Sequence, residues 1–325
     1  MQYAVYLPNF GDYFDPRVIA ELAADAEAAG WDGFFLWDHL THPNHLDQPF
    51  ADPWIQLAAA ALATQRMRLG LMVTPIPRRR PWKLAKEVVT LDHLSGGRLI
   101  FAAGLGTHPV EFGNLGEETD PVTRAEMLDE GLDVLAGLCS GQAFQFEGKH
   151  YHVKPTRFLP GALQQPRVPV WIAGVYPKRG PFARALRWDG YFPLGGLRDN
   201  RFLTPREIAE ISQAAQDRRP AGAAFDLIAS GWTDKMDLPA AARFTAEFAA
   251  AGATWYVEAL DPWYYAFDTA RAIIRRGPPR GERYGACKMS DSCYQGKSNR
   301  EVREEREVSF VSLGVLRQLR GSLVS

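Results

Sequence analysis

The stretch Val168-Pro169-Val170-Trp171-Ile172-Ala173-Gly174 predicts a buried strand whose carboxyl end approaches a ligand. It is an apolar, β-branched run that proline bounds and two small residues end, which is typical of a strand in the core of a sheet. Just before it, residues 145–153 (Gln-Phe-Glu-Gly-Lys-His-Tyr-His-Val) alternate apolar and polar side chains around a glycine, which predicts a short β-hairpin. A central strand therefore follows directly on an inserted hairpin.

Outward from this strand, strand-like and helix-like segments alternate up to about residue 276. We expect strands at 3–8, 33–38, 68–74, 99–106, 168–174, 190–194, 225–230 and 253–260. Helices are expected near 16–30, 53–65, 81–96, 122–138, from 177 onward, and near 205–216, 239–250 and 263–276. Eight such β/α units predict an α/β fold, a (β/α)8 TIM barrel with residues 141–167 inserted between the fourth helix and the fifth strand.

An open doubly wound sheet is the alternative, because it also alternates strands and helices. The count of eight units disfavours it, and no glycine-rich dinucleotide turn follows the first strand. Gly104-Leu105-Gly106 is the candidate for such a turn, but Pro109 stands where a third glycine would be needed. We therefore divide the chain into a barrel domain at 1–280 and a C-terminal extension at 281–325, which is expected to be disordered or loosely docked.

Composition narrows the class of function. The formal net charge of −1 provides no field that would favour nucleic acid or membranes, and no apolar run approaches the length of about 20 residues that spans a bilayer. The three cysteines form neither a metal-type spacing nor a disulfide framework, which suits a reducing compartment. No signal peptide is recognisable, so a cytoplasmic protein that acts on small molecules is expected.

In a TIM barrel the chemistry sits at the carboxyl ends of the strands. The second strand ends in Trp37-Asp38-His39, an aromatic ring, a carboxylate and an imidazole, which suit proton transfer beside a planar cofactor. A histidine that merely binds loop backbone is the other interpretation. His42 and His45 follow at intervals of three residues, but a loop does not fix ligand geometry, and we expect no metal.

Three further strand ends carry polar or glycine-rich sequence. Gly104 and Gly106 would let a ring lie against the backbone, with His108 and Glu111 in reach; a plain glycine-rich turn is the alternative. Arg78-Arg79-Arg80 is either a solvated charge run or an anion site.

The fifth strand ends in Ala173, Gly174 and Val175 and leads into a helix that begins near Lys178 and Arg179. Free amides and the positive dipole end of such a helix bind phosphate, although an ordinary helix start would look the same.

These segments, in this order over about residues 1–280, resemble the luciferase-like monooxygenase family, whose members use flavin or deazaflavin. The resemblance implies that His39 is the acid/base near the reactive ring carbon and that Asp38 contacts the cofactor. It also implies that Val73 and Thr74 form a backbone bulge that supports the ring, sometimes with a non-proline cis peptide. Thr107 matches the position of a cofactor-binding residue in the family.

The resemblance also places the flavin phosphate after the fifth strand, although the family often has hydroxyl residues where this chain has Val175 and Lys178. It suggests a substrate pocket lined by Trp37, His108, Glu111 and Glu258. The expected function is that of a flavin- or F420-dependent oxidoreductase or monooxygenase acting on a small organic molecule, with coenzyme F420 favoured over FMN and a homodimer as the expected assembly. A catalytically silent flavin-binding barrel is one alternative. A non-redox barrel lyase is another, but it would want a lysine at a strand end.

Overall fold

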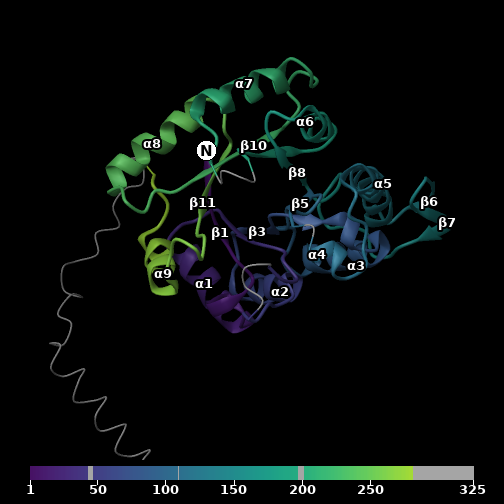
Figure 1. Ribbon diagram of the computed structural model, residues 1–325, viewed down its shortest axis with the longest axis horizontal. Coiled ribbons are helices and arrows are strands. Elements are labelled where there is room, and N and C mark those ends of the chain that lie inside the picture. Colours follow the sequence, from purple (N-terminus) through teal and green to yellow (C-terminus); the bar gives the residue numbers. More distant parts are fainter. Residues whose placement is uncertain (43–46, 109, 197–200, 281–325) are drawn as a thin grey trace, which may run out of the picture. The chain divides into compact units, whose positions relative to one another are not determined.

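The structure, a computed structural model, describes residues 1–42, 47–108, 110–196 and 201–280 of the 325-residue chain (Figure 1). The extension expected at 281–325 lies outside the described residues. Within the described part, no helix is both long enough and apolar enough to cross a membrane.

One sheet of parallel strands forms the centre of the molecule. Its members are β1 (Gln2–Leu7), β2 (Gly33–Leu36), β3 (Arg68–Leu71), β4 (Thr74–Pro75), β5 (Phe101–Gly104), β8 (Val170–Val175), β9 (Gly190–Leu194), β10 (Asp226–Gly231) and β11 (Trp255–Ala259). The order across the sheet is β3-β2-β1-β11-β10-β9-β8-β5-β4. Because β1 pairs with β11, the first strand lies beside the last, as in a barrel.

The barrel closes through its third strand, which is interrupted. β3 and β4 are two parts of the strand expected at 68–74, and the peptide bond between Met72 and Val73, which separates them, is cis. β3 pairs with β2, and its Leu69 forms a parallel bridge to Leu99 just before β5, while β4 pairs with β5. Both ends of the sheet thus meet in one broken strand, and the predicted (β/α)8 architecture is confirmed.

Helices follow the strands in the expected order and cover the barrel (Figure 1). They are α1 (Pro16–Ala28), α2 (Pro53–Ala63), α3 (Pro81–Leu94), α5 (Pro121–Cys139), α6 (Arg179–Ala185), α7 (Pro205–Gln216), α8 (Leu238–Ala250) and α9 (Phe267–Arg276), with a short α4 (Val110–Gly113) in the loop after β5 and the 3-10 turns η1 (Gly11–Tyr13) and η2 (Ile76–Arg78). Asp-Pro pairs start several of them: Asp15, Asp52 and Asp120 each accept hydrogen bonds from first-turn amides, and proline follows each.

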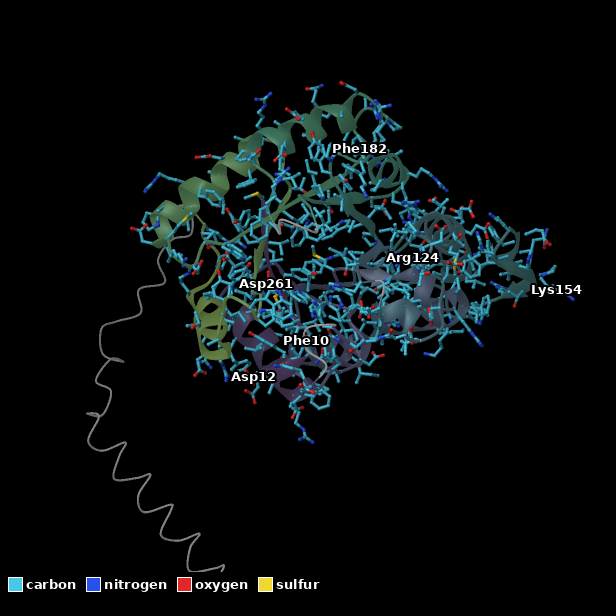
Figure 2. The ribbon with its side chains drawn as sticks, viewed as in Figure 1. Phe10, Asp12, Arg124, Lys154, Phe182 and Asp261 are labelled. Atoms are coloured by element: carbon cyan, nitrogen blue, oxygen red, sulfur yellow. The ribbon has the colours of Figure 1, made fainter. Side chains whose placement is uncertain are left out.

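The insertion between the fourth barrel helix and the fifth strand is an antiparallel hairpin, as predicted. It consists of β6 (Ala143–Glu147) and β7 (His152–Arg157) and lies beyond α5, at the right in Figures 1 and 2, where Lys154 is labelled. The Glu130 carboxylate on α5 accepts hydrogen bonds from the amides of Lys149, His150 and Tyr151 at 2.8–3.0 Å. These bonds fix the hairpin turn to the barrel.

Alternate residues of each strand face two different cores. On β11, Trp255 and Val257 pack inside the barrel with Phe35 and Trp171, whose rings lie 6.1 and 5.4 Å from that of Trp255. Tyr256 points the other way and packs on the aromatic rings of α8. This alternation also sends the next residue, Glu258, toward the helix layer.

Candidate active site

The carboxyl ends of the strands surround a cavity of about 460 Å3, counting the space open to solvent. Its lining brings together these residues that the sequence singled out: Trp37, Asp38, His39, Val73, Gly106, Thr107, Glu111 and Ala173. Tyr6, Met72, Phe192 and Leu194 add an apolar wall to one side.

His39 is held by a carboxylate from a distant loop. Its Nδ1 lies 3.1 Å from Oε2 of Glu111, and 16% of its side chain is exposed. The backbone around it is fixed by Asn9, whose amide nitrogen donates to the His39 carbonyl at 2.8 Å. Because an ionised carboxylate can only accept, Nδ1 carries the proton in this pair, and Nε2 keeps a lone pair.

Glu111 is almost fully buried, with 1% of its side chain exposed. Its Oε1 accepts a hydrogen bond from the Leu40 amide at 2.9 Å and lies 3.4 Å from Nη1 of Arg78. Burial alone would raise the pKa of Glu111, but the hydrogen bond from His39, the charges of His39 and Arg78 and the Leu40 amide together lower it. Glu111 is therefore ionised at neutral pH.

The Asp38 carboxylate is enclosed by two arginines. Nη2 of Arg78 donates to its Oδ1 and to its backbone carbonyl, both at 2.9 Å. Nη2 of Arg79 contacts Oδ1 and Oδ2 at 2.9 and 2.8 Å. The arginine run is therefore neither a solvated charge run nor a free anion site at these two positions, because both arginines neutralise Asp38. The Asp38 carboxylate, with 0% of its side chain exposed, has little capacity left for a ligand.

The two glycines after the fourth strand are required by packing within the protein. A Cβ on Gly104 would lie 2.6 Å from Cγ2 of Val73. Gly106 has φ +81°, and a Cβ there would lie 2.6 Å from the Phe112 ring, on which the Arg124 guanidinium stacks at 4.3 Å (Figure 2 labels Arg124). Gly106 lines the cavity, whereas Gly104 lies behind Val73.

The interruption of the third strand lies at the cavity wall. Met72 and Val73 line the cavity, and the Tyr6 hydroxyl donates to the Met72 carbonyl. The non-proline cis peptide expected from the resemblance is present here. Thr74 is fully buried beside them, and its hydroxyl has no hydrogen-bond partner among the described residues.

The predicted phosphate-binding segment lies at the same end of the barrel but outside the cavity lining, apart from Ala173. Gly174 accepts a hydrogen bond from the Tyr191 hydroxyl at 3.2 Å, and Val175 accepts one from the Lys178 amide at 3.0 Å. The Lys178 and Arg179 side chains are exposed at the start of α6.

Two of the expected pocket residues have other surroundings. His108 is near the site: its ring lies 5.6 Å from that of His39 and 4.5 Å from that of His42, and burial, followed by the charge of His39, lowers its pKa. Glu258 does not line the cavity. It is fully buried on the helix side of β11, where it accepts hydrogen bonds from the amide and hydroxyl of Thr233, both at 2.7 Å.

No group of three or more His, Cys, Asp or Glu side chains in the described part of the chain is arranged to hold a metal ion. His45, the third histidine of the spaced series, lies outside the described residues.

The chain also matches a known protein family along most of its length. The family description "Luciferase-like monooxygenase" matches residues 1–287. The chain belongs to the luciferase-like monooxygenase family. The expected enzyme class, a flavin- or F420-dependent oxidoreductase or monooxygenase, is thereby confirmed at the level of the family.

Relatives within reach of sequence comparison are distant. An uncharacterized protein of Mycobacterium tuberculosis (strain H37Rv) is 27% identical over 212 residues, which are 60% of this chain and 70% of that protein. Limonene 1,2-monooxygenase of Rhodococcus erythropolis is 34% identical over 142 residues, 42% of this chain and 35% of the relative. An F420-dependent secondary alcohol dehydrogenase, solved with an F420–acetone adduct, superimposes with a TM-score of 0.65 at 19% identity, covering 86% of this chain and 98% of the other. This last likeness shows the shared fold.

Sequence reasoning missed several residues of this luciferase-like site. In the sequence, Arg78 and Arg79 belong to a charge run. Their shared partner Asp38 lies 40 residues before Arg78, so the sequence does not indicate the pairing. Tyr6 lines the cavity and carries no signal in the sequence beyond that of an apolar strand.

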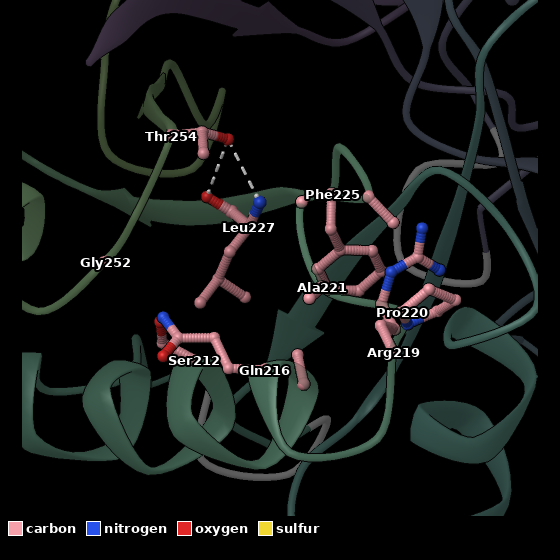
Figure 3. Close-up of a pocket in the computed structure, with 12 residues that line it drawn as sticks. Ser212, Gln216, Arg219, Pro220, Ala221, Phe225, Leu227, Gly252 and Thr254 are labelled. Atoms are coloured by element: carbon pink, nitrogen blue, oxygen red, sulfur yellow. Dashed lines mark hydrogen bonds between the residues drawn. The ribbon is translucent and has the colours of Figure 1, made fainter.

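The opposite end of the luciferase-like barrel carries a second cavity, shown in Figure 3, between α7 and the segments that precede β10 and β11. The Arg219 guanidinium donates to the carbonyls of Leu186, Trp188 and Ala224 at 2.7–2.9 Å, and the Thr254 hydroxyl bonds to Leu227. These polar groups are engaged in holding loops, and the cavity that contains His39 and Glu111 lies at the other face.

Proposed function

We propose that this protein is an oxidoreductase that uses a flavin or deazaflavin, with coenzyme F420 favoured over FMN, and that His39 exchanges the proton of the reaction. The observation that supports this best is the pair formed by His39 and Glu111 beside the cavity, with 3.1 Å between Nδ1 and Oε2. When bound, the cofactor supplies the redox chemistry, which no protein side chain here provides.

In this proposal the protein's own side chains hold a proton and transfer it at one atom, Nε2 of His39. Glu111 keeps the proton of His39 on Nδ1, so Nε2 is the nitrogen that takes up or returns a proton on the cavity side. Trp37 packs edge-on against the His39 ring at 5.7 Å and restricts its rotation. A fixed tautomer and a fixed ring plane are what a general acid/base needs.

The cavity fits a planar ring. Apolar groups of Val73, Ala173 and Phe192 form one wall, and the polar side offers His39 and Thr107. The Thr74 hydroxyl and the Trp37 indole N–H are buried polar groups without a partner among the described residues, as expected of atoms near a ligand site. We assign the phosphate to the segment from Gly174 to Arg179, on charge and position alone.

The substrate that fits is small, organic and uncharged. The carboxylates of Asp38 and Glu111 are balanced by Arg78 and Arg79, so the cavity offers no free charge from these groups to pair with an ionic substrate. The name of the relative limonene 1,2-monooxygenase keeps oxygen insertion with FMN as the second candidate reaction. The Asp38-His39 pair favours hydride exchange with F420.

We further propose a cytoplasmic homodimer. Helix α2 carries no charged side chain, and its outward residues Ile55 and Leu62 are 63% and 70% exposed. An exposed apolar helix face of this kind marks an interaction surface.

Titration of the purified protein with F420 and, separately, with FMN tests the function. Cofactor fluorescence and absorbance report binding, and bleaching or recovery of the absorbance after addition of an uncharged alcohol, ketone or terpene reports turnover. Binding and bleaching with F420 support the proposal in its favoured form, and oxygen-dependent product with reduced FMN supports the second candidate. Binding of neither cofactor contradicts both, and binding without any turnover indicates a catalytically silent barrel.

A further inference from the structure

We propose that Arg78 is the positioning residue of this site: it holds Glu111 ionised and in place, and through Glu111 it fixes the tautomer and orientation of His39. The inference rests on the proposed function, in which His39 handles the proton. It concerns a residue that is not part of the cavity lining and that reaches the histidine only through Glu111.

Arg78 joins three loops of the barrel. It ends the turn η2 after the third strand, and 2% of its side chain is exposed. One nitrogen, Nη2, binds the carbonyl and Oδ1 of Asp38 after β2, while Nη1 lies 3.4 Å from Oε1 of Glu111 after β5. A guanidinium is planar and forked, so it can serve two carboxylates at once.

The two carboxylates depend on Arg78 to different degrees. Asp38 has a second arginine, because Arg79 contacts both of its oxygens. Among the described residues, the ion pairs of Glu111 are with Arg78 and with His39 itself. Loss of the Arg78 charge therefore leaves Asp38 neutralised, but it leaves Glu111 with backbone amides and the His39 ring, and with no permanent charge in an ion pair. A buried carboxylate without a balancing charge takes up a proton or turns away.

The consequence reaches His39 through one hydrogen bond. Glu111 can hold the proton on Nδ1 of His39 only while it is ionised, since a protonated carboxyl group could donate instead. Other ionisable groups surround these residues: His42 and His108 lie beside the His39 ring, Asp38 and Glu117 interact with Arg78, and Arg79 contacts Asp38. The side chains of Asp38, Arg79 and Glu117 form no hydrogen bond or ion pair with the Glu111 carboxylate in the described part of the chain, so the effect of Arg78 is separable from theirs.

The test uses the cofactor-free full-length protein and needs no redox activity. Histidine side-chain nitrogen NMR on ring-labelled protein reports the tautomer of each of the seven histidines, and a His39→Asn variant assigns the His39 signals. We expect wild-type His39 to be the Nδ1–H tautomer at pH 7 and Arg78→Met to give a mixture of tautomers. Where Arg78→Met does not fold, Arg78→Gln, which keeps an N–H donor for the Asp38 carbonyl, is measured in its place.

Turnover of the loaded enzyme gives an independent readout. The acid limb of its pH profile should move to higher pH in the Arg78 variant, because the loss of a close opposite charge raises the pKa of a carboxylate. In a Glu111→Gln background the Arg78 substitution should have no further effect on His39, because the two residues act in series.

A matched control is Arg184→Met. Arg184 is likewise mostly buried, with 9% of its side chain exposed, and it pairs with Asp129 at 2.7 Å on the outside of the barrel. It should leave the His39 tautomer and the acid limb unchanged.

Unchanged His39 signals and an unchanged acid limb in a folded Arg78 variant would overturn the inference, and so would the same change in Arg184→Met. Failure of the proposed function is distinguishable: the tautomer would still shift in the cofactor-free protein, while neither cofactor would bind or react.

Discussion

His39 and Glu111 are 72 residues apart in the chain, yet Nδ1 of the histidine lies 3.1 Å from Oε2 of the glutamate. The histidine follows the second strand and the glutamate lies on the short helix α4 after the fourth strand of the barrel. The barrel brings the two loops together at its carboxyl face, where one residue can hold a proton and the other can fix where that proton sits.

Removal of the imidazole should affect chemistry more than binding. We expect His39→Ala to lower turnover by roughly 10²-fold or more, because general acid/base groups contribute about 10²–10⁴. Cofactor affinity, measured by fluorescence titration, should change much less. His152→Ala, on the exposed hairpin, is the control and should turn over like the wild type. Unchanged turnover together with lost cofactor binding would make His39 a binding residue.

Glu111→Gln should remove the acid limb of the pH profile. The pKa of Glu111 is lowered in the folded protein, so its ionised form is present above that pKa and is lost as the pH falls through it. Where Glu111 alone sets the acid limb, wild-type turnover should accordingly persist to a pH below about 4.3, which is the usual pKa of a glutamate. Glutamine can donate to Nδ1 and select the other tautomer, so turnover should fall by roughly tenfold or more. A variant that keeps both rate and acid limb would contradict the pairing.

Cofactor binding should depend on the two exposed cations at the start of α6. The double variant Lys178→Ala with Arg179→Ala should weaken binding at least about tenfold, or about 1.4 kcal/mol. A double variant of Arg206 and Lys235 to alanine removes the same charge from other exposed positions and should bind normally. The phosphate assignment would be refuted if the wild type and the two double variants all bound F420 with the same affinity and all bound FMN with the same affinity.

Glu258 should make stability depend on pH with the opposite sign to an ordinary carboxylate pair. Burial raises its pKa to about 7, whereas an unfolded glutamate has about 4.3. Between these values the folded state retains a proton that the unfolded state has lost, so the free energy of unfolding falls as the pH rises through this window. The free energy of unfolding of Glu258→Gln, taken relative to that of the wild type, should therefore be higher at pH 8 than at pH 5. The expected difference is on the order of 3 kcal/mol.

Thermal unfolding at the two pH values measures this difference, with the exposed Glu247→Gln on α8 as the control. An equal loss of stability at both pH values in Glu258→Gln would show that the Thr233 hydrogen bonds, and not the ionisation, dominate at this position.

The assembly is checked on helix α2. Introducing Glu at both Ile55 and Leu62 should convert a dimer to a monomer in light scattering after size exclusion, because charge on a buried apolar patch opposes association. Leu159→Glu, at a position 60% exposed elsewhere, should leave the mass unchanged. A wild-type protein that is already monomeric at micromolar concentration, or a dimer that survives the double substitution, rules out this surface.

Much of the barrel could be predicted because its strands are short apolar runs with clear ends. The sixth strand was placed at 190–194 and the structure has Gly190–Leu194. Helix α9 begins at Phe267 and not near 263 as expected. The reason is a turn before it, in which the Asp261 carbonyl accepts hydrogen bonds from the amides of Tyr264 and Tyr265. The break within the third strand was expected from the resemblance to relatives, and no pattern in the residues themselves indicates it.

The site was harder to predict because its partners are distant in the chain. In the sequence, Arg78 belongs to a run that suits either solvent or an anion, and the carboxylate that binds it cannot be identified without the fold. Glu258 illustrates a different limit: both faces of a parallel strand are covered, so an apolar strand does not reveal which of its faces looks into the barrel. A shift of one residue along β11 therefore decides whether a side chain points into the barrel or, like that of Glu258, lies beneath a helix.

His39, Arg78 and Glu111 follow the second, third and fourth strands, so the proton machinery proposed above is encoded in one continuous quarter of the gene, residues 38–111. Part of the cavity lining, namely Ala173, Phe192 and Leu194, is encoded separately, after the hairpin. Loops from that later part could be exchanged between relatives, or randomised in a library, without touching the groups that set the protonation of the histidine. The barrel thus lets selection for a new substrate proceed independently of selection for chemistry.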